Sequence, residues 1–317
     1  MKLLRTTLLV FLLVSLPLAY AKADTVQLQK QEDSLRHIAF RLFHCKTDES
    51  RALANEGFHD YLENTLRLDG SFDYPFDSLK DIGKLKSPDG TFKIYDWNIQ
   101  KEDGSMTYFG FIQRLNPKTG KMDLFSLTDK SSEIKNAESQ SLDCKKWFGV
   151  LYYKIIRNKS GKNVYYTLLG WDGHNNQTWR KIIEVLWFDR DGVPHFGENI
   201  FNMGKFPKKR VVFEFHAEMI MALKYNEDKG MIIFDNLAPE NPEGKGIYET
   251  YVMDGSYNGL VFKKGKWQFI PDVNALNPKN PNDKFYEDPR GESDKKGSNS
   301  LGPVKKKKTD TPAGEQK

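Results

Sequence analysis

The chain has 317 residues, of which 29% are charged, and its formal net charge is +5. Lys2 and Arg5 account for two of these positive charges, and residues 274–317 carry ten Lys or Arg against seven Asp or Glu. The segment between them, residues 22–273, is therefore neutral. This excludes a general electrostatic attraction for nucleic acid or for an anionic membrane.

The N-terminus predicts a cleavable secretory signal peptide over residues 1–21. A short basic region precedes the apolar run Leu8–Leu18, and small-x-small cleavage sites follow at residues 19–21 and 21–23. The apolar run is shorter than the roughly 20 residues that a transmembrane helix needs, although a membrane anchor is the alternative. We therefore expect a periplasmic or secreted protein with no transmembrane segment after cleavage.

Residues 22–86 predict an N-terminal helical region followed by a linker. Apolar residues within Leu35–Phe43 recur at helical spacing and predict a helix over residues 34–45. The same spacing within Phe58–Leu66 predicts a second helix. In residues 71–86 aromatic side chains are scattered among Asp, Pro and Gly, so we expect an ordered linker held in place by its aromatic residues.

Residues 87–273 predict an antiparallel β domain. Segments 164–169 and 182–188 are apolar on both strand faces, which is typical of central strands covered on each side. Further strands are expected at residues 92–99, 106–113, 122–127, 147–156, 211–215, 219–225, 231–234, 248–253, 260–263 and 267–270. The predicted fold class is mainly β (α+β), with the N-terminal helices packed on an antiparallel meander that forms a sandwich or barrel. A small β-propeller is the alternative.

Two further features concern the ends and the cysteines. Residues 274–317 are rich in Lys, Asn, Pro and Gly and predict a disordered basic tail, because they cannot bury enough apolar surface to fold. Cys45 and Cys144 are the two cysteines of the chain. They either form a disulfide across a loop of about 100 residues or are two buried thiols, and the sequence leaves both possibilities open.

The loop between the two central strands is the best candidate for a site. It places Trp171, Asp172, His174 and Asn175 within five residues, on a loop held by buried strands. Asp172 and His174 are the types of residue that carry general acid and base catalysis, together with Asp235 at a second strand end. Trp171 and Asn175 are candidate ligand-binding residues, because an indole ring can stack on a sugar. The alternative is a polar hairpin tip.

Glu214, His216 and Glu218 alternate along a predicted strand and would share one face, as a weak candidate metal site. The same pattern is typical of a half-exposed strand, and we favour that interpretation. No nucleophile elbow, Walker loop, zinc-protease motif or Cys-x-x-Cys is present in the sequence. The sequence therefore predicts neither metal nor cofactor, and it does not decide whether the protein is an enzyme.

Three stretches together resemble a family of secreted, uncharacterised proteins from Bacteroidetes-type bacteria. They are Tyr165-Tyr-Thr-Leu-Leu-Gly-Trp-Asp-Gly173, Phe234-Asp-Asn-Leu-Ala-Pro239 and Asp254-Gly-Ser-Tyr-Asn-Gly259, supported by Ser87-Pro-Asp-Gly90. The resemblance spans roughly residues 58–273 and implies export and a shared fold, but no activity. This chain has Asn236 where the family carries histidine, which weakens a histidine-based site there.

The leading functional hypothesis is a non-catalytic binding or cell-envelope structural protein, with envelope polysaccharide or protein as its partner. The rival is an envelope hydrolase that acts on glycan or peptide through Asp172, His174 and Asp235. The rival requires these three side chains to share one cleft. The binding hypothesis requires at least two of four tryptophans to be exposed on one surface: Trp97, Trp171, Trp179 and Trp267.

Overall fold

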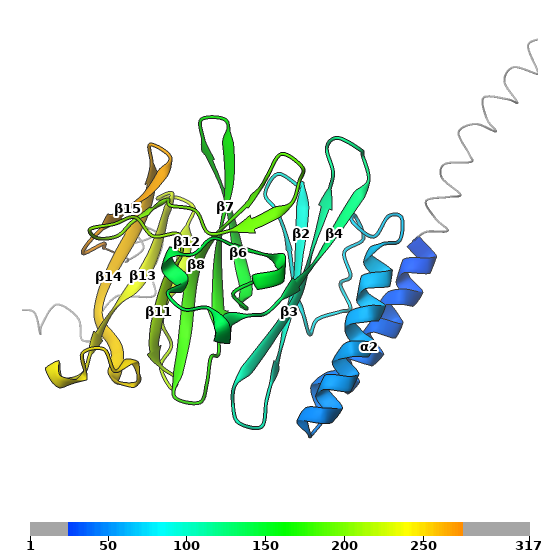
Figure 1. Ribbon diagram of the computed structural model, residues 1–317, viewed down its shortest axis with the longest axis horizontal. Helices are drawn as coiled ribbons and strands as arrows, with labels where there is room; N and C mark the ends of the chain where they lie inside the picture. The colour runs from blue at the N-terminus through cyan, green and yellow to red at the C-terminus, as the bar shows by residue number, and fades with distance from the viewer. Residues whose placement is uncertain (1–24, 275–317) are drawn as a thin grey trace, which may run out of the picture. The chain divides into compact units, whose positions relative to one another are not determined.

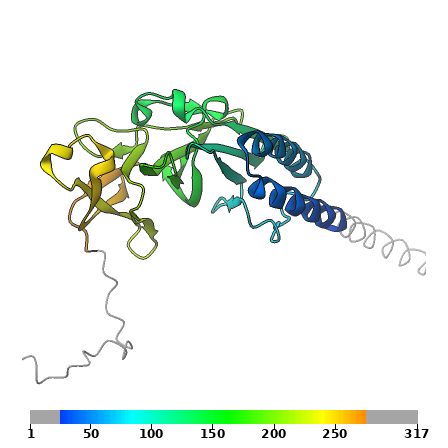
Figure 2. The same ribbon diagram turned by 90° about the horizontal axis from the view of Figure 1, so that it is seen from below.

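The computed structural model describes residues 25–274, and all of them belong to one unit that ends at Asn274 (Figure 1). The predicted signal peptide and the predicted tail beyond Asn274 lie outside the described residues. A first helix covers residues 25–44, and α2 spans Asp48–Leu66. Both helices lie over one face of a four-stranded sheet (Figure 2).

The first sheet is antiparallel throughout. Its strands, in spatial order, are β1 (Gly83–Lys86), β2 (Phe92–Gln100), β3 (Met106–Leu115) and β4 (Met122–Thr128). One face packs Trp97 and Phe111 against Leu35 and Leu62 of the two helices. The helices therefore complete a core that this sheet could not close by itself.

The central sheet is built on the long hairpin of β7 and β8. Its strands are β5 (Leu142–Asp143), β6 (Leu151–Ser160), β7 (Asn163–Asp172), β8 (Thr178–Phe188), β9 (Pro194–Phe196) and β11 (Val211–His216). β7 pairs with β6 on one side and with β8 on the other. The other edge of β8 pairs with β11 along its first half and with β9 along its last residues.

The third sheet contains the C-terminal strands and one short strand from earlier in the chain. In spatial order it runs β10 (Phe201–Asn202), β15 (Lys266–Ile270), β14 (Tyr251–Lys263), β13 (Met231–Pro239) and β12 (Leu223–Asn226). The pair of β10 and β15 is parallel, and the other pairs are antiparallel.

The three sheets stack face to face, with the central sheet in the middle (Figure 1). Leu168 packs with Ile112 of the first sheet, whereas the next residue, Leu169, packs with Leu260 of the third. This confirms the prediction that β7 and β8 are apolar on both faces because they are covered on both sides. The fold is a layered sandwich with helices on one side, and none of the sheets closes into a barrel.

Several predicted strand limits are wrong. Asp254-Gly255 and Asn258-Gly259 do not separate two strands, because residues 251–263 form one strand along β13 and β15. Residues 219–222 are not in a strand, and β6 begins four residues later than predicted. In each case the strand begins or ends where its backbone pairing with a neighbouring strand begins or ends, and local turn residues do not predict that point.

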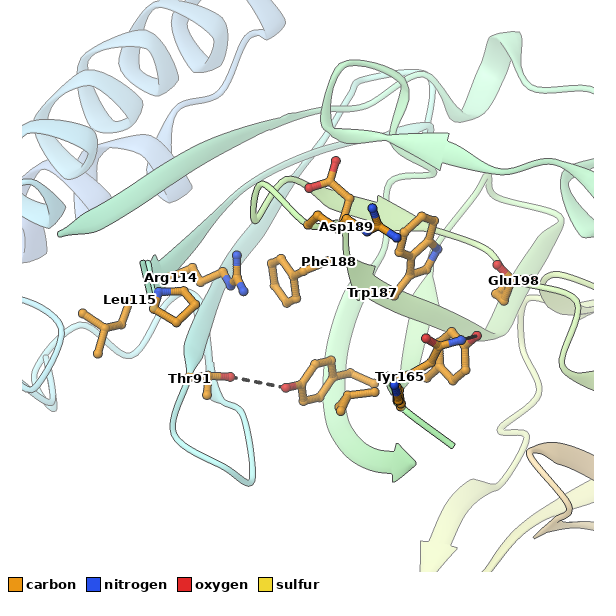
Figure 3. A pocket seen from close by; sticks show the side chains of 14 residues that line it. Thr91, Arg114, Leu115, Tyr165, Trp187, Phe188, Asp189 and Glu198 are labelled. Carbon is orange, nitrogen blue, oxygen red and sulfur yellow. Dashed lines mark hydrogen bonds between the residues drawn. The ribbon is translucent and has the colours of Figure 1, made fainter. Parts of the chain in front are cut away.

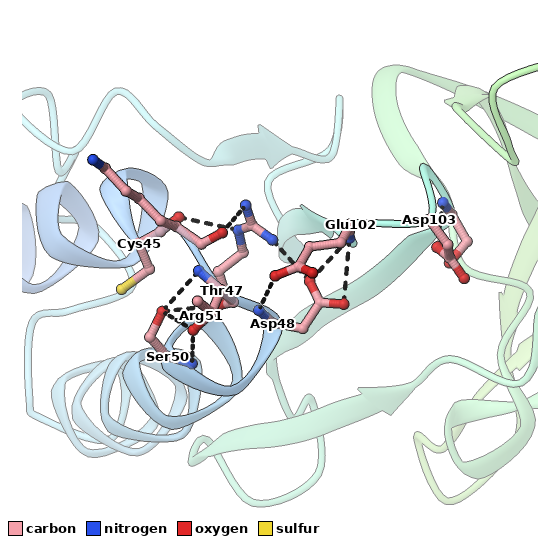
Figure 4. A network of polar contacts seen from close by, with 9 residues as sticks. Cys45, Thr47, Asp48, Ser50, Arg51, Glu102 and Asp103 are labelled. Carbon is pink, nitrogen blue, oxygen red and sulfur yellow. Dashed lines mark hydrogen bonds and ion pairs between the residues drawn. The ribbon is translucent and has the colours of Figure 1, made fainter.

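The start of α2 is tied to the β2–β3 turn by polar contacts (Figure 4). Thr47 and Ser50 cap each other's backbone N–H groups, at 3.2 Å in both directions. Asp48 accepts a hydrogen bond from the backbone N–H of Glu102 at 3.0 Å, and its own N–H donates to the Glu102 carboxylate at 3.3 Å. These contacts fix the hairpin end that borders the candidate site.

The linker and the cysteines can also be placed. Phe76 and Leu79 of the linker are fully buried in the core beneath the helices, as the aromatic pattern predicted. Cys45 and Cys144, whose pairing the sequence left open, are both free thiols. Cys144 packs at the edge of the core between the first and central sheets, and burial raises the pKa of its thiol to about 12.

Candidate functional site

Asp172 and Arg180 are brought together by the register of the β7–β8 hairpin. The two residues are cross-strand partners near the loop end of the hairpin. Both side chains point toward the first sheet, because they alternate with residues that face the third sheet. Asn175 shapes the loop, since its carboxamide oxygen accepts hydrogen bonds from the backbone N–H groups of Gln177 and Thr178 at 2.7 and 2.8 Å.

Arg180 is the centre of the polar cluster. Its Nε donates to Glu214 Oε2 at 2.7 Å, and its Nη1 lies 3.5 Å from Asp172 Oδ2. Its Nη2 lies 2.8 Å from His174 Nε2. One guanidinium therefore holds two carboxylates and an imidazole that come from β7, the hairpin loop and β11. The strong geometric preference of a planar guanidinium fixes their relative positions.

The Asp172 carboxylate is almost fully buried. Its Oδ1 accepts hydrogen bonds from the Tyr108 hydroxyl at 2.9 Å and from the His174 backbone N–H at 2.7 Å. Burial raises the pKa of the Asp172 carboxyl, while these two donors and the charge of Arg180 act in the opposite direction. Tyr108 also accepts from the backbone N–H of Gly173 at 2.7 Å, so it anchors the loop to β3.

The protonation of His174 follows from its contact with Arg180. Arginine stays protonated and can only donate, so His174 Nε2 must accept, and the proton of the neutral ring is on Nδ1. Burial, followed by the charge of Arg180, lowers the pKa of the His174 imidazole. The residue also has a positive φ of 33°, a conformation that costs energy for a side chain larger than glycine.

The cluster forms part of the wall of a cleft with a volume of about 850 Å³. The opposite wall comes from the ends of β2 and β3, and the rim comes from the segment of residues 131–138 and from Tyr248. The β2–β3 turn is held against the β7–β8 loop, because Asn176 Nδ2 donates to the Asp103 carbonyl at 3.2 Å. The cleft therefore opens between the first and central sheets.

Most charged groups in the cleft are already satisfied by neighbours. Lys208 pairs with Glu138 at 2.7 Å, and Asp129 accepts backbone hydrogen bonds from Tyr108, Ser131 and Gly149. Lys101 makes no side-chain hydrogen bond or ion pair with any described residue. Together with His174 Nδ1 and the hydroxyls of Ser131, Ser132 and Tyr248, it offers donors to the cleft.

Comparison with known families, curated proteins and solved structures finds no match to this chain. Within residues 25–274, the structure contains no helix that is both long and apolar enough to cross a membrane.

The other predicted site residues do not join the cleft. Asp235 lies on β13 in the third sheet, is not among the residues that line the cleft, and accepts a hydrogen bond from the backbone N–H of Ala222 at 2.6 Å. Trp171 is half-buried and contacts Trp179 edge to face at 5.6 Å, also outside the cleft lining. Trp97 and Trp267 are fully buried core residues and Trp179 is half-buried, so the expectation of at least two exposed tryptophans on one surface is not met. The three-residue catalytic set predicted with Asp235 is therefore not formed.

The candidate metal residues do not gather either. β11 ends at His216, so Glu218 is outside the strand and exposed, and its backbone N–H donates to His216 Nδ1 at 3.1 Å. Glu214 points away to Arg180 and Thr178. Among the described residues, no three His, Cys, Asp or Glu side chains are placed to hold a metal ion.

Arg180, Tyr108 and Glu214 belong to the polar cluster, although the loop sequence does not point to them. Arg180 could have been found, because a hairpin whose register is centred on residue 176 places position 180 opposite Asp172. Tyr108 and Glu214 come from other strands, 64 and 34 residues from their partners Asp172 and Arg180. Nothing in the local sequence pattern links them to the loop.

Proposed function

We propose that the protein is an exported, non-catalytic binding protein of the cell envelope, and that the cleft beside Arg180 holds its ligand. The observation that carries the proposal is the contact of His174 Nε2 with Arg180 at 2.8 Å. A general base needs a free lone pair, and the basic nitrogen of this imidazole already accepts from a permanently charged donor.

The carboxylates support the same conclusion. Glu214 uses one oxygen for the Thr178 hydroxyl at 2.8 Å and the other for Arg180. Asp172 is buried behind Tyr108 and the loop backbone. A nucleophile or base that is fully engaged by neighbours must break these bonds before it can react, so the cluster is better suited to shaping a rigid binding wall.

The free groups of the cleft favour a ligand rich in acceptor oxygens. Lys101, His174 Nδ1–H and two serine hydroxyls can all donate, and Tyr248 adds a half-exposed ring at the rim. Polysaccharides and polar peptides offer such acceptors at regular spacing, and both are constituents of the cell envelope. Export rests on the signal-like N-terminus and on the resemblance to secreted proteins of Bacteroidetes-type bacteria.

The ligand class can be tested by titrating the full chain with muropeptides, linear gluco-oligosaccharides and short polar peptides. We expect one class to bind, and Lys101→Gln to weaken that binding about tenfold, equivalent to about 1.4 kcal/mol. Lys145→Gln is the matched control, because this exposed lysine lies outside the cleft lining and the change removes the same charge. Failure of all three classes at about 1 mM, or equal effects of the two variants, would contradict the proposal.

An envelope hydrolase remains the second candidate, because Asp172 and His174 do line one cleft. The same incubations followed by mass spectrometry separate the two functions. The binding proposal expects an intact ligand after prolonged incubation. Release of products that is abolished by both Asp172→Asn and His174→Ala would instead identify a hydrolase.

A further inference from the structure

A second groove lies at the opposite end of the β7–β8 hairpin, with a volume of about 580 Å³ (Figure 3). The pairing of β7 with β8 stops at Tyr166 and Leu186, although β7 begins at Asn163 and β8 ends at Phe188. The two strands therefore diverge into separate hairpins, β6–β7 and β8–β9. The groove lies between these hairpins and the end of β3.

Aromatic rings line this groove from both diverging strands. Tyr165 and Tyr166 come from β7, and Trp187 and Phe188 come from β8. Tyr165, Trp187 and Phe188 are only partly buried, although one face of Trp187 stacks on His195 at 4.6 Å and one face of Phe188 carries Arg114. Four rings around one groove are suited to a ligand that presents a flat, partly apolar ring face.

Arg114 lies on the face of Phe188, with 4.3 Å between the guanidinium carbon and the ring centroid. None of its five N–H groups donates to an acceptor in the described part of the chain. Gly192 closes over Nη1, since a Cβ at that position would lie 2.1 Å from this nitrogen. Desolvation lowers the pKa of Arg114, so the charge is partly removed from water without a direct ionic partner.

Two of the buried polar atoms without a partner among residues 25–274 belong to this groove, Arg114 Nη1 and Trp187 Nε1. Both are donors without exposed surface, whereas Nε and Nη2 of Arg114 are neither bonded to a described residue nor buried, so these two nitrogens offer donors to an acceptor in the groove. Arg114, Lys162 and Arg190 line it without an ion pair to any described residue. Of the two lining carboxylates, Asp189 is engaged by His195 at 3.2 Å, and Glu198 uses one oxygen for its neighbour's N–H.

We propose that this groove binds an acidic saccharide, a sugar unit that carries a carboxylate. The sugar ring stacks on the aromatic residues, and its carboxylate takes the Nε–H and Nη2–H donors of Arg114, because Nη1 is buried under Gly192. The second oxygen of Glu198 accepts from a sugar hydroxyl. The excess of cations over carboxylates favours the charged sugar over a neutral one. This site is separate from the cleft beside Arg180 and does not depend on the function proposed for it.

The test titrates the full chain with a glucuronate oligosaccharide, with a neutral gluco-oligosaccharide of equal length, and with benzoate. We expect the acidic sugar to bind at least about tenfold more tightly than either of the others. Arg114→Gln should weaken the binding of the acidic sugar about tenfold relative to the wild type, because charge-assisted hydrogen bonds are lost. Trp187→Phe should weaken the binding of the acidic sugar roughly threefold, since this change removes part of a ring that lines the groove.

Lys121→Gln is the matched control, because it removes one positive charge from the adjacent β3–β4 loop but not from the groove lining. It should leave the affinity unchanged. Equal affinity for the acidic and neutral sugars, or benzoate binding as tightly as glucuronate, would overturn the assignment. If Arg114→Gln does not fold, Arg114→Lys retains the charge and loses the planar donor pair, and undiminished affinity in that variant would also overturn it.

Discussion

Replacing Arg210 with methionine is expected to lower the free energy of unfolding by about 3 to 5 kcal/mol. Arg210 and Glu184 form an ion pair in which neither side chain has any exposed surface. Glu184 also accepts from the Tyr152 hydroxyl at 2.6 Å, and Arg210 donates to the Ala137 carbonyl at 2.5 Å. Removing the arginine leaves a buried carboxylate with one remaining donor, which is the costly situation.

Urea unfolding measures the loss of stability in Arg210→Met. Two further variants test whether the loss comes from the buried charge. Lys208→Met removes a half-exposed ion pair two residues earlier and should cost less than about 1 kcal/mol. The double variant Arg210→Met with Glu184→Leu should be more stable than Arg210→Met alone, because no buried charge is left unpaired. Equal losses for Arg210→Met and Lys208→Met would contradict the assignment of Arg210 as a core residue.

Replacing Asp96 with asparagine is expected to remove most of the pH dependence of the free energy of unfolding between about pH 4 and pH 7. Asp96 is fully buried between the first and central sheets, and this burial raises the pKa of its carboxyl to about 7. One oxygen accepts from the Tyr152 backbone N–H at 2.9 Å, and Oδ1 has no partner among the described residues. The folded state therefore holds a proton that the unfolded chain releases near its ordinary value of 3.8.

The direction of the effect follows from proton linkage. Because the folded state binds more protons than the unfolded state between about pH 4 and pH 7, stability falls across that range and levels off above it. A shift of this size corresponds to roughly 4 kcal/mol. Asp96→Asn should therefore be more stable than the wild type at about pH 8, with little difference at about pH 5.

Urea titrations at both pH values measure the difference. Asp81→Asn is the control, since Asp81 is an exposed carboxylate without a side-chain partner among residues 25–274. It should leave the pH dependence as it is in the wild type. An Asp96→Asn protein that is less stable than the wild type at both pH values would show instead that the carboxylate is needed in its charged form.

The layered fold could be predicted where periodicity reports burial. Neighbouring apolar residues such as Leu168 and Leu169 indicate that β7 is covered on both faces. Helical spacing predicts both helices but not where they begin, since residue 25 is already part of the first and α2 begins at Asp48, before the predicted spans of residues 34–45 and 58–66. The edge strand β1 was missed because Gly83 and two lysines carry no strand pattern. Its pairing with β2 holds it in place. The division into three sheets could not be predicted from local sequence patterns either, because it depends on contacts between distant segments.

The candidate site could be predicted only in part. The loop sequence drew attention to Asp172 and His174, and both line the cleft. It could not show that Arg180 engages both, because that contact depends on the hairpin register and on side-chain direction. Asp235 was grouped with Asp172 and His174 because it also follows an apolar strand segment in the sequence. It lies on β13, in another sheet. Composition identifies reactive residue types, whereas topology decides which of them meet.

The protonation of the His174 ring distinguishes a binding cleft from a catalytic one. The measurement is a ¹⁵N NMR titration of the imidazole nitrogens between about pH 5 and pH 8, with His174→Gln used to assign the signal among six histidines. The binding account predicts a neutral ring with its proton on Nδ1 and a pKa below the ordinary value of 6.5, because Arg180 donates to Nε2. A ring that carries its proton on Nε2, or that titrates at or above 6.5, would contradict the account and place a free base in the cleft.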